Sequence, residues 1–309
     1  MRALFSILFA LAIALPARSE INPATDQPEK GISGKTLTGQ PLREPDWPES
    51  TRRRLEMDLE IAKAVFDVAP QREDSWIWLG RRYGYLGWYA DAIDVFTAGL
   101  ERFPDSYKLH RFRGRHRARN RDFEGAIDDY RAGIEKMQGQ ADTYEPDGIP
   151  NARRQPISTY RSNLHYYLGQ TSFATADYEI MLVELDRSLE SPIALDIDDH
   201  RIAVAFWKYL ALRKLGRDAE ASMLLQALPP KPVLIENETY HRAIRVFSEP
   251  DAEARAARSG DSLARFALGM KHVFAGRLDD ARRVLEAVVE ANALGYWPAE
   301  AELTRAPLR

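Results

Sequence analysis

The residues with the clearest chemical capacity in this sequence are arginines. Residues 111–121 read RFRGRHRARNR, so an arginine occupies every second position. Guanidinium groups form paired, charge-assisted hydrogen bonds with carboxylates and phosphates, and the run therefore predicts contact with anions. Three roles are open for it: a nucleic-acid-binding arm, a solvated helix face, or one wall of a binding groove.

The charge of the whole chain restricts these roles. Among 309 residues, 43 Lys and Arg stand against 46 Asp and Glu, which gives a formal net charge of -3. This balance does not favour nucleic acid or an anionic membrane as the main partner. The arginine run is therefore a local feature.

The alternation itself is compatible with either a strand or a helix. The intervening residues are Phe, Gly, His, Ala and Asn, which do not form the β-branched apolar face of a strand. On a helix, the six arginines separate into two stripes on roughly opposite sides. The first stripe comprises Arg111, Arg115 and Arg119, and the second comprises Arg113, Arg117 and Arg121.

An internal repeat favours the helix. Residues 74–104 and 108–137 align with an offset of about 34 residues, and each copy has two stretches of helical apolar periodicity separated by a short turn. The matched pairs are Gly80 with Gly114, Ala92 with Ala126, Phe96 with Tyr130, and Gly99 with Gly133. Because a glycine inside a helix costs about 1 kcal/mol relative to alanine, we expect these glycines where a partner helix approaches closely.

The first of these windows resembles the tetratricopeptide repeat (TPR) family. The resemblance is carried by Trp76, Leu79, Gly80, Tyr83, Gly87, Tyr89, Ala92, Phe96 and Pro104. With looser copies it implies five repeats, near residues 73–106, 107–140, 155–188, 202–235 and 262–295. The implied fold is all-α: a right-handed α-solenoid of stacked helix-turn-helix repeats with helical caps, over residues 51–305.

The resemblance also implies a binding surface. In the TPR family, the positions of the first arginine stripe line a concave groove that binds partner peptides. The groove residues implied here are Arg81, Tyr85, Arg111, Arg115, Arg119, Asn163 and Tyr167. In the second stripe, Arg113 and Arg117 stand where the family has packing residues, and we expect these two to pair with Asp91, Asp94, Asp128 or Asp129. A solvated helix face remains the competing interpretation of the first stripe.

The start of the chain predicts export. The chain begins with a cationic residue, Arg2, which is followed by an apolar run over residues 3–15 and then a proline, and this is the pattern of a secretory signal peptide. We expect cleavage after Ser19 or Ala17 and a periplasmic or secreted protein. The Pro-rich composition of residues 20–50 predicts a flexible leader. No later segment has the roughly 20 apolar residues that a membrane-spanning helix requires.

The sequence offers no evident catalytic or metal-binding set. It has no cysteine, and its six histidines lack the spacing of a metal site. It also contains no nucleophile motif and no nucleotide-binding loop. We therefore expect a protein that is not an enzyme and that uses neither a cofactor nor a metal.

These predictions combine into one functional hypothesis and one alternative. The hypothesis is an exported TPR scaffold or adaptor that binds a peptide or protein partner in its concave groove. The alternative is capture of an anionic envelope or extracellular polymer by the arginine stripe. Ionic strength separates them, because polymer capture should weaken steeply with added salt whereas a groove with tyrosine anchors should retain its affinity.

Overall fold

A computed structural model describes residues 31–190 and 197–308 of the chain. The signal peptide predicted over residues 1–19 and the first part of the leader lie outside these ranges. Within the described ranges, the regular structure consists of fourteen α-helices, and the only extended pairing is two isolated β-bridges. The all-α prediction is therefore confirmed.

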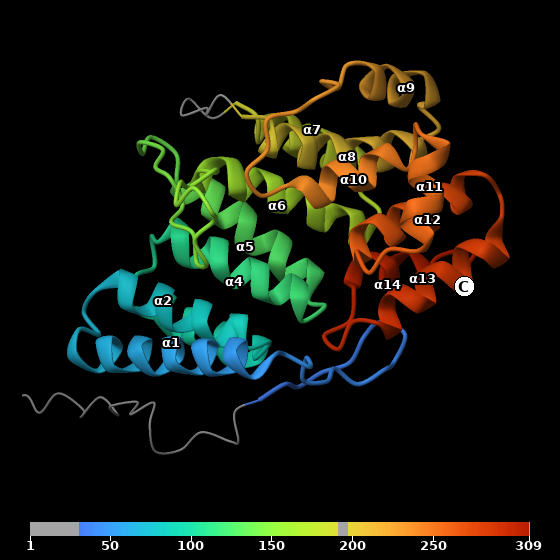
Figure 1. Cartoon of the computed structure of the whole chain (residues 1–309). Coiled ribbons are helices and arrows are strands. Elements are labelled where there is room, and N and C mark those ends of the chain that lie inside the picture. Colours follow the sequence, from blue (N-terminus) through green and yellow to red (C-terminus); the bar gives the residue numbers. More distant parts are fainter. Residues whose placement is uncertain (1–30, 191–196, 309) are drawn as a thin grey trace, which may run out of the picture. The chain divides into compact units, whose positions relative to one another are not determined.

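The helices follow one another as packed pairs (Figure 1). The helix pairs at the five repeat windows are α2 (Glu73–Tyr85) and α3 (Tyr89–Arg102), α4 (Tyr107–Arg119) and α5 (Phe123–Lys136), α6 (Tyr160–Thr175) and α7 (Tyr178–Arg187), α8 (Asp199–Lys214) and α9 (Asp218–Gln226), and α12 (Ser262–Phe274) and α13 (Leu278–Glu290). Helix α8 begins before the fourth window that the sequence predicts at residues 202–235. The other helices are α1 (Glu49–Val68), α10 (Glu238–Arg245), α11 (Pro250–Ala257) and α14 (Trp297–Leu303).

The repeated glycines mark the closest contacts within these pairs. A Cβ atom added to Gly80 would lie 2.4 Å from Cζ of Phe96, and one added to Gly114 would lie 2.8 Å from Cε1 of Tyr130. Both distances are shorter than real side chains tolerate. The 34-residue period therefore has a physical basis, since the same close approach of two helices occurs in consecutive pairs.

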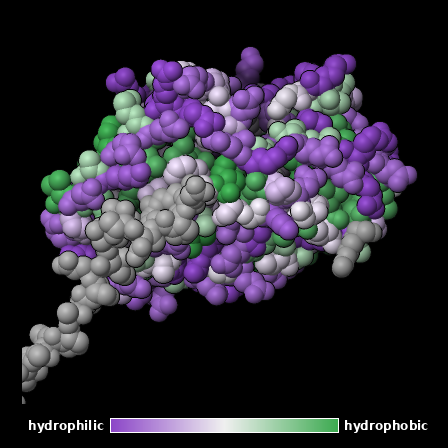
Figure 2. Space-filling view, turned by 90° about the horizontal axis from the view of Figure 1, so that it is seen from below, coloured by the Kyte–Doolittle hydropathy of each residue, from purple (hydrophilic) through white to green (hydrophobic). Residues whose placement is uncertain are grey.

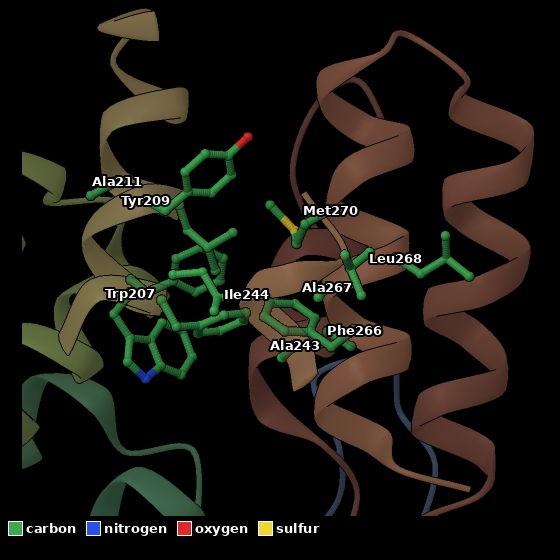
Figure 3. Packing of buried hydrophobic residues seen from close by; sticks show 14 of the residues in the cluster. Trp207, Tyr209, Ala211, Ala243, Ile244, Phe266, Ala267, Leu268 and Met270 are labelled. Carbon is green, nitrogen blue, oxygen red and sulfur yellow. The ribbon is translucent and has the colours of Figure 1, made fainter. Parts of the chain in front are cut away.

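The segment between the fourth and fifth windows contributes to the core. Its helix α10 packs against both α8 and α12. Figure 3 shows this contact, with Trp207 from α8, Ile244 from α10 and Phe266 from α12 gathered in one apolar cluster. All three side chains are buried. The insertion thus joins the fourth pair to the fifth, which a loop could not do.

The leader differs in part from its prediction. From residue 31 on, the chain runs beside the C-terminal segment (Figure 1). The backbone N–H of Leu37 donates to Oε2 of Glu300 at 2.9 Å, and that of Arg43 donates to the carbonyl of Ala293 at 2.7 Å. Leu42 is buried. The composition argument considered only the apolar residues of the leader itself, whereas the C-terminal segment supplies the surface that orders it.

Helix α1 is apolar on two faces. Its inward residues, such as Leu55 and Leu59, are buried in the core. Its outward apolar residues Met57, Ile61, Val65 and Val68 are exposed. Figure 2 shows the molecule from the side on which α1 lies in Figure 1, where hydrophobic residues stand among polar ones. Across the described ranges, no helix combines the length and the apolar character needed to cross a membrane.

Candidate binding site

A pocket of about 610 Å³ lies beside α4. Its walls come from α2, α4, α5, α6, α8 and α10, from the loop at residues 145–149, and from the C-terminal segment at residues 294–298. All seven residues predicted for the groove line this pocket: Arg81, Tyr85, Arg111, Arg115, Arg119, Asn163 and Tyr167. The structure therefore brings together side chains from three different helix pairs in one pocket.

Arg111 forms the deepest part of the cationic wall. Its side chain is fully buried, and its Nη2 donates to Oε1 of Glu145 at 2.9 Å. Its Nε and Nη1, together with Oε2 of Glu145 and Nη1 of Arg81, are buried without a hydrogen-bond partner among the described residues. A buried donor without an acceptor is costly, so these atoms mark a place where an additional polar group would be stabilised.

Arg115 and Arg119 lie on the same face of α4 and differ from Arg111. Both are partly buried, and no carboxylate among the described residues forms an ion pair with either of them. Their guanidinium carbons instead lie 5.4 Å from the ring centre of Tyr167 and 5.8 Å from that of Tyr89. Cation–π contacts leave the N–H donors of both groups available to an anion in the pocket.

The second stripe is neutralised by carboxylates. Nη2 of Arg113 lies 2.7 Å from Oδ1 of Asp129, and Nη1 of Arg117 lies 2.9 Å from its Oδ2. Burial opposes ionisation of Asp129, but the hydrogen bonds from His110 and Arg113 and the charge of Arg117 hold its pKa below the ordinary value. Asp129 was one of the four acids expected to pair with this stripe, and the structure shows that pairing.

Arg121 has a partner that sequence reasoning missed. Its Nη2 lies 2.5 Å from Oε1 of Glu300 in α14, and both side chains are buried. The same Nη2 donates to the carbonyl of Leu294 at 2.9 Å. The pair fixes the C-terminal wall of the pocket to the end of α4. Gly295 permits this approach, since its φ is +68° and an added Cβ would lie 2.2 Å from the guanidinium.

The loop at residues 145–149 closes another side of the pocket. Nη2 of Arg81 donates to the carbonyl of Pro146 at 2.9 Å, and Nη1 of Arg82 donates to that of Gly148 at 3.0 Å. Gly148 lies so close to Tyr85 that a Cβ would overlap the phenol oxygen, at 1.4 Å. Burial and the charge of Glu236 raise the pKa of Asp147 in this loop to about 6.

Tyr167 lies beside the arginines of the pocket, and their charges act on its phenol. Burial alone would raise the pKa of its phenol, but the charges of Arg115 and Arg111 outweigh burial and hold this pKa below the ordinary value. The guanidinium carbon of Arg111 lies 4.1 Å from the ring centre. The guanidinium groups of Arg111 and Arg115 beside this ring would also stabilise a bound anion.

The opposite end of the pocket is aromatic, and sequence reasoning missed it. Tyr166 donates from its hydroxyl to that of Tyr240 at 2.9 Å, and the indole nitrogen of Trp207 donates to both hydroxyls at 3.1 and 3.2 Å. Figure 3 shows that indole nitrogen pointing away from the apolar cluster. Burial raises the pKa of Tyr166 and Tyr240, so both phenols stay neutral. No spacing within one repeat could have indicated this group, because Tyr240 lies in the insertion.

Asn163 belongs to the pocket wall through a structural contact. Its side-chain amide donates to the hydroxyl of Ser158 at 2.9 Å, and the residue is buried. It therefore positions the loop before α6. Across the described ranges, no group of three or more His, Asp or Glu side chains is arranged to hold a metal ion.

The described chain is all-helical with repeated helix pairs, which is consistent with the tetratricopeptide repeat family. No family model matches the chain, and no curated protein matches it. Among solved structures, YrrB is described as a TPR protein with an unusual peptide-binding site. It is 13% identical, with 75% of this chain and 93% of YrrB covered and a TM-score of 0.42.

Two further solved structures also match this chain. The APC/C hetero-tetramer Cut9–Hcn1 is 14% identical, with 82% of this chain and 40% of that chain covered and a TM-score of 0.49. Naa15/Naa10 bound to HypK-THB is 13% identical, with 79% and 35% covered and a TM-score of 0.36. This chain therefore spans less than half of the length of each of these two proteins.

Proposed function

We propose that this chain is an exported, non-catalytic interaction protein that binds an acidic segment of a partner protein in the pocket beside α4. The observation that carries the proposal is the pair Arg115 and Arg119, which face the pocket without a carboxylate partner among the described residues. Export rests on the signal peptide predicted at residues 1–19, and the N-terminal mass of the protein in the exported fraction tests it.

The chain itself supplies an example of the expected recognition. Glu300, on the short helix α14, is fully buried against Arg121 at the end of the arginine run. In α14, Glu302 is also buried and pairs with Lys214 and Arg305. Arg121 at the end of α4 and Lys214 at the end of α8 thus each pair with a buried acid of a helix that is distant in the sequence. Arg115 and Arg119 offer the same chemistry where the described chain provides no acid.

The geometry favours a short protein segment over a long anionic polymer. A polymer would require a continuous row of available cations, but Arg113 and Arg117 are occupied by Asp129. The available arginines instead face a pocket closed by the loop at residues 145–149 and the C-terminal segment. Such a site admits a few residues of a partner, and its buried donors would strengthen each ion pair that forms.

A peptide titration tests the proposal. We expect acetylated, amidated tetra-glutamate to bind the purified protein and tetra-glutamine to bind far more weakly in isothermal titration calorimetry. Arg115→Gln should weaken tetra-glutamate binding about tenfold or more, because a hydrogen bond to a charged group contributes about 1.5–3 kcal/mol. The matched control is Arg131→Gln, an exposed arginine of α5 that does not line the pocket.

Two outcomes would contradict the proposal. One is equal binding of tetra-glutamate by Arg115→Gln, Arg131→Gln and the unaltered protein. The other is an affinity that rises continuously with the length of a polyglutamate chain and collapses with moderate salt, which would support polymer capture.

A further inference from the structure

One end of the pocket is cationic and the other is aromatic. From this difference we infer that the ligand is an acidic segment with an aromatic side chain close to the acid. The inference rests on the proposed binding function and specifies its ligand. It depends on which polar atoms of the pocket are already used and which are not.

The cationic end contains hydrogen-bond donors that have no acceptor among the described residues. Arg111 uses Nη2 for Glu145, while its Nε and Nη1 remain without a partner within the described ranges. Arg115 and Arg119 contribute two further guanidinium groups. Of the five arginines that line the pocket, Arg111 and Arg121 pair with Glu145 and Glu300, and Arg115 and Arg119 pair with no carboxylate among the described residues. An anionic group would therefore gain hydrogen bonds and a counter-charge here without displacing an existing ion pair.

The aromatic end engages its most buried polar atoms internally. The hydroxyls of Tyr166 and Tyr240 and the indole nitrogen of Trp207 bond to one another. Tyr166 and Trp207 are buried, so a ligand meets mainly the partly buried side chains of Tyr240, Leu263, Tyr296 and Trp297. Trp297 stacks on Trp207 with ring centres 6.2 Å apart. An apolar group is stabilised at such a surface, whereas a second charged group would lose its hydration without gaining a partner.

Aromatic rings suit this wall better than aliphatic groups. The rings here already pack edge to face, as Tyr166 does with Tyr167 at 5.2 Å and Phe206 does with Tyr240 at 5.6 Å. A further ring can extend this arrangement and gain the edge-to-face attraction in addition to the burial of its area.

Tyr167 shows that the two ends are close enough for one short segment. Its ring centre lies 5.4 Å from the guanidinium carbon of Arg115 and 5.2 Å from the ring centre of Tyr166. A single aromatic ring therefore separates the cationic wall from the aromatic wall. Neighbouring residues of an extended peptide can span this separation, since consecutive Cα atoms are about 3.8 Å apart.

The test uses three acetylated, amidated peptides: Glu-Glu-Phe-Glu, Glu-Glu-Gly-Glu and Gln-Gln-Phe-Gln. Binding to the purified protein is measured by calorimetry and by tryptophan fluorescence. We expect the Phe peptide to bind about tenfold more tightly than the Gly peptide, since half-burial of an aromatic side chain corresponds to about one power of ten. The Gln peptide should bind more weakly than either.

Variants locate each part of the ligand. Arg115→Gln should weaken the Phe and Gly peptides by the same factor, because it acts on the acid alone. Tyr240→Leu should abolish the difference between Phe and Gly, whereas Tyr240→Phe, which keeps the ring and loses only the hydroxyl, should preserve it. A circular dichroism melt accompanies each variant, and Tyr296→Leu serves as a second variant of the aromatic wall if Tyr240→Leu does not fold.

The outcomes separate the inference from the function on which it rests. If both acidic peptides bind equally and depend on Arg115, the inference is overturned and the proposed function stands. If no acidic peptide depends on Arg115, the proposed function fails as well. A Phe preference that persists in Tyr240→Leu and in Tyr296→Leu would place the aromatic ring elsewhere and would also overturn the inference.

Discussion

The arginines on one run of eleven residues fall into two groups, one that pairs with carboxylates and one that contacts aromatic rings. Arg111, Arg113, Arg117 and Arg121 each pair with a carboxylate. Arg115 and Arg119 pair with none among the described residues and meet aromatic rings at the pocket wall. Residue type is the same for both groups, and Arg111 of the first group shares a helix face with Arg115 and Arg119 of the second. The difference therefore comes from what the rest of the fold places opposite each position.

The carboxylates that pair with arginines of this run come from three different parts of the molecule. Asp129 lies within the same helix pair, on α5. Glu145 lies in the loop after that pair, and Glu300 lies 179 residues beyond Arg121. Each pair ties α4 to a different part of the molecule: its own repeat, the loop that closes the pocket, and the C-terminal helix. The paired arginines thus have structural roles, although Arg111 keeps two donors without a partner among the described residues, and Arg115 and Arg119 remain available for a ligand.

The largest effect is expected at Glu300. Glu300→Gln should lower the free energy of unfolding by about 3–5 kcal/mol, because it leaves the buried guanidinium of Arg121 without its counter-charge. Urea denaturation followed by circular dichroism measures this change. Glu286→Gln, an exposed position on α13, is the matched control and should change stability by less than about 0.5 kcal/mol.

A double variant sharpens this prediction. Replacing both partners, with Arg121→Met and Glu300→Leu, removes the buried charges together and should cost less than Glu300→Gln alone. Equal stability of Glu300→Gln and the unaltered protein would show that Arg121 does not depend on this carboxylate, and the distinction between paired and available arginines would lose its main support.

A smaller effect, which depends on pH, is expected at Asp129. Asp129→Asn should cost about 2–3 kcal/mol at pH 7. Arg113 and Arg117 are less buried than Arg121 and can recover part of the loss from water. The pKa of Asp129 is lower in the folded protein than its ordinary value of about 3.9. Its contribution is therefore fully present above that ordinary value and is lost as the pH falls through the lower, folded-state pKa.

Urea titrations of both proteins between pH 7 and pH 2 measure this dependence. The difference in unfolding free energy between the unaltered protein and Asp129→Asn should be constant from pH 7 to about pH 5 and should shrink below about pH 4. A difference that grows on acidification would contradict the assignment of Asp129 as an ionised partner of Arg113, Arg117 and His110.

The sequence predicted the parts of this arrangement that repeat. Helix pairs and their glycine contacts follow from a 34-residue register, because each copy places equivalent residues on the same face, and the seven pocket positions follow from the resemblance to the tetratricopeptide repeat family. Asp129 could be named as a partner since it lies within one helix pair of Arg113 and Arg117. Glu300, Tyr240 and the ordered part of the leader have no such register. Their positions depend on how the C-terminal segment returns to α4, which local periodicity does not encode.

The smallest effect on stability is expected where the effect on binding is largest. Arg115→Gln and Arg119→Gln should each change the unfolding free energy by less than about 1 kcal/mol, because neither removes an ion pair and neither leaves a buried partner charge. Removing one of several neighbouring cations also relieves repulsion in the pocket wall, which opposes the loss of the ring contact. Urea denaturation measures the change in unfolding free energy. Its comparison at low and at moderate ionic strength separates the relieved repulsion from the lost ring contact. A loss above 2 kcal/mol at either position would mean that this arginine belongs to the structural group, and the comparison between the two groups would then have to be redrawn.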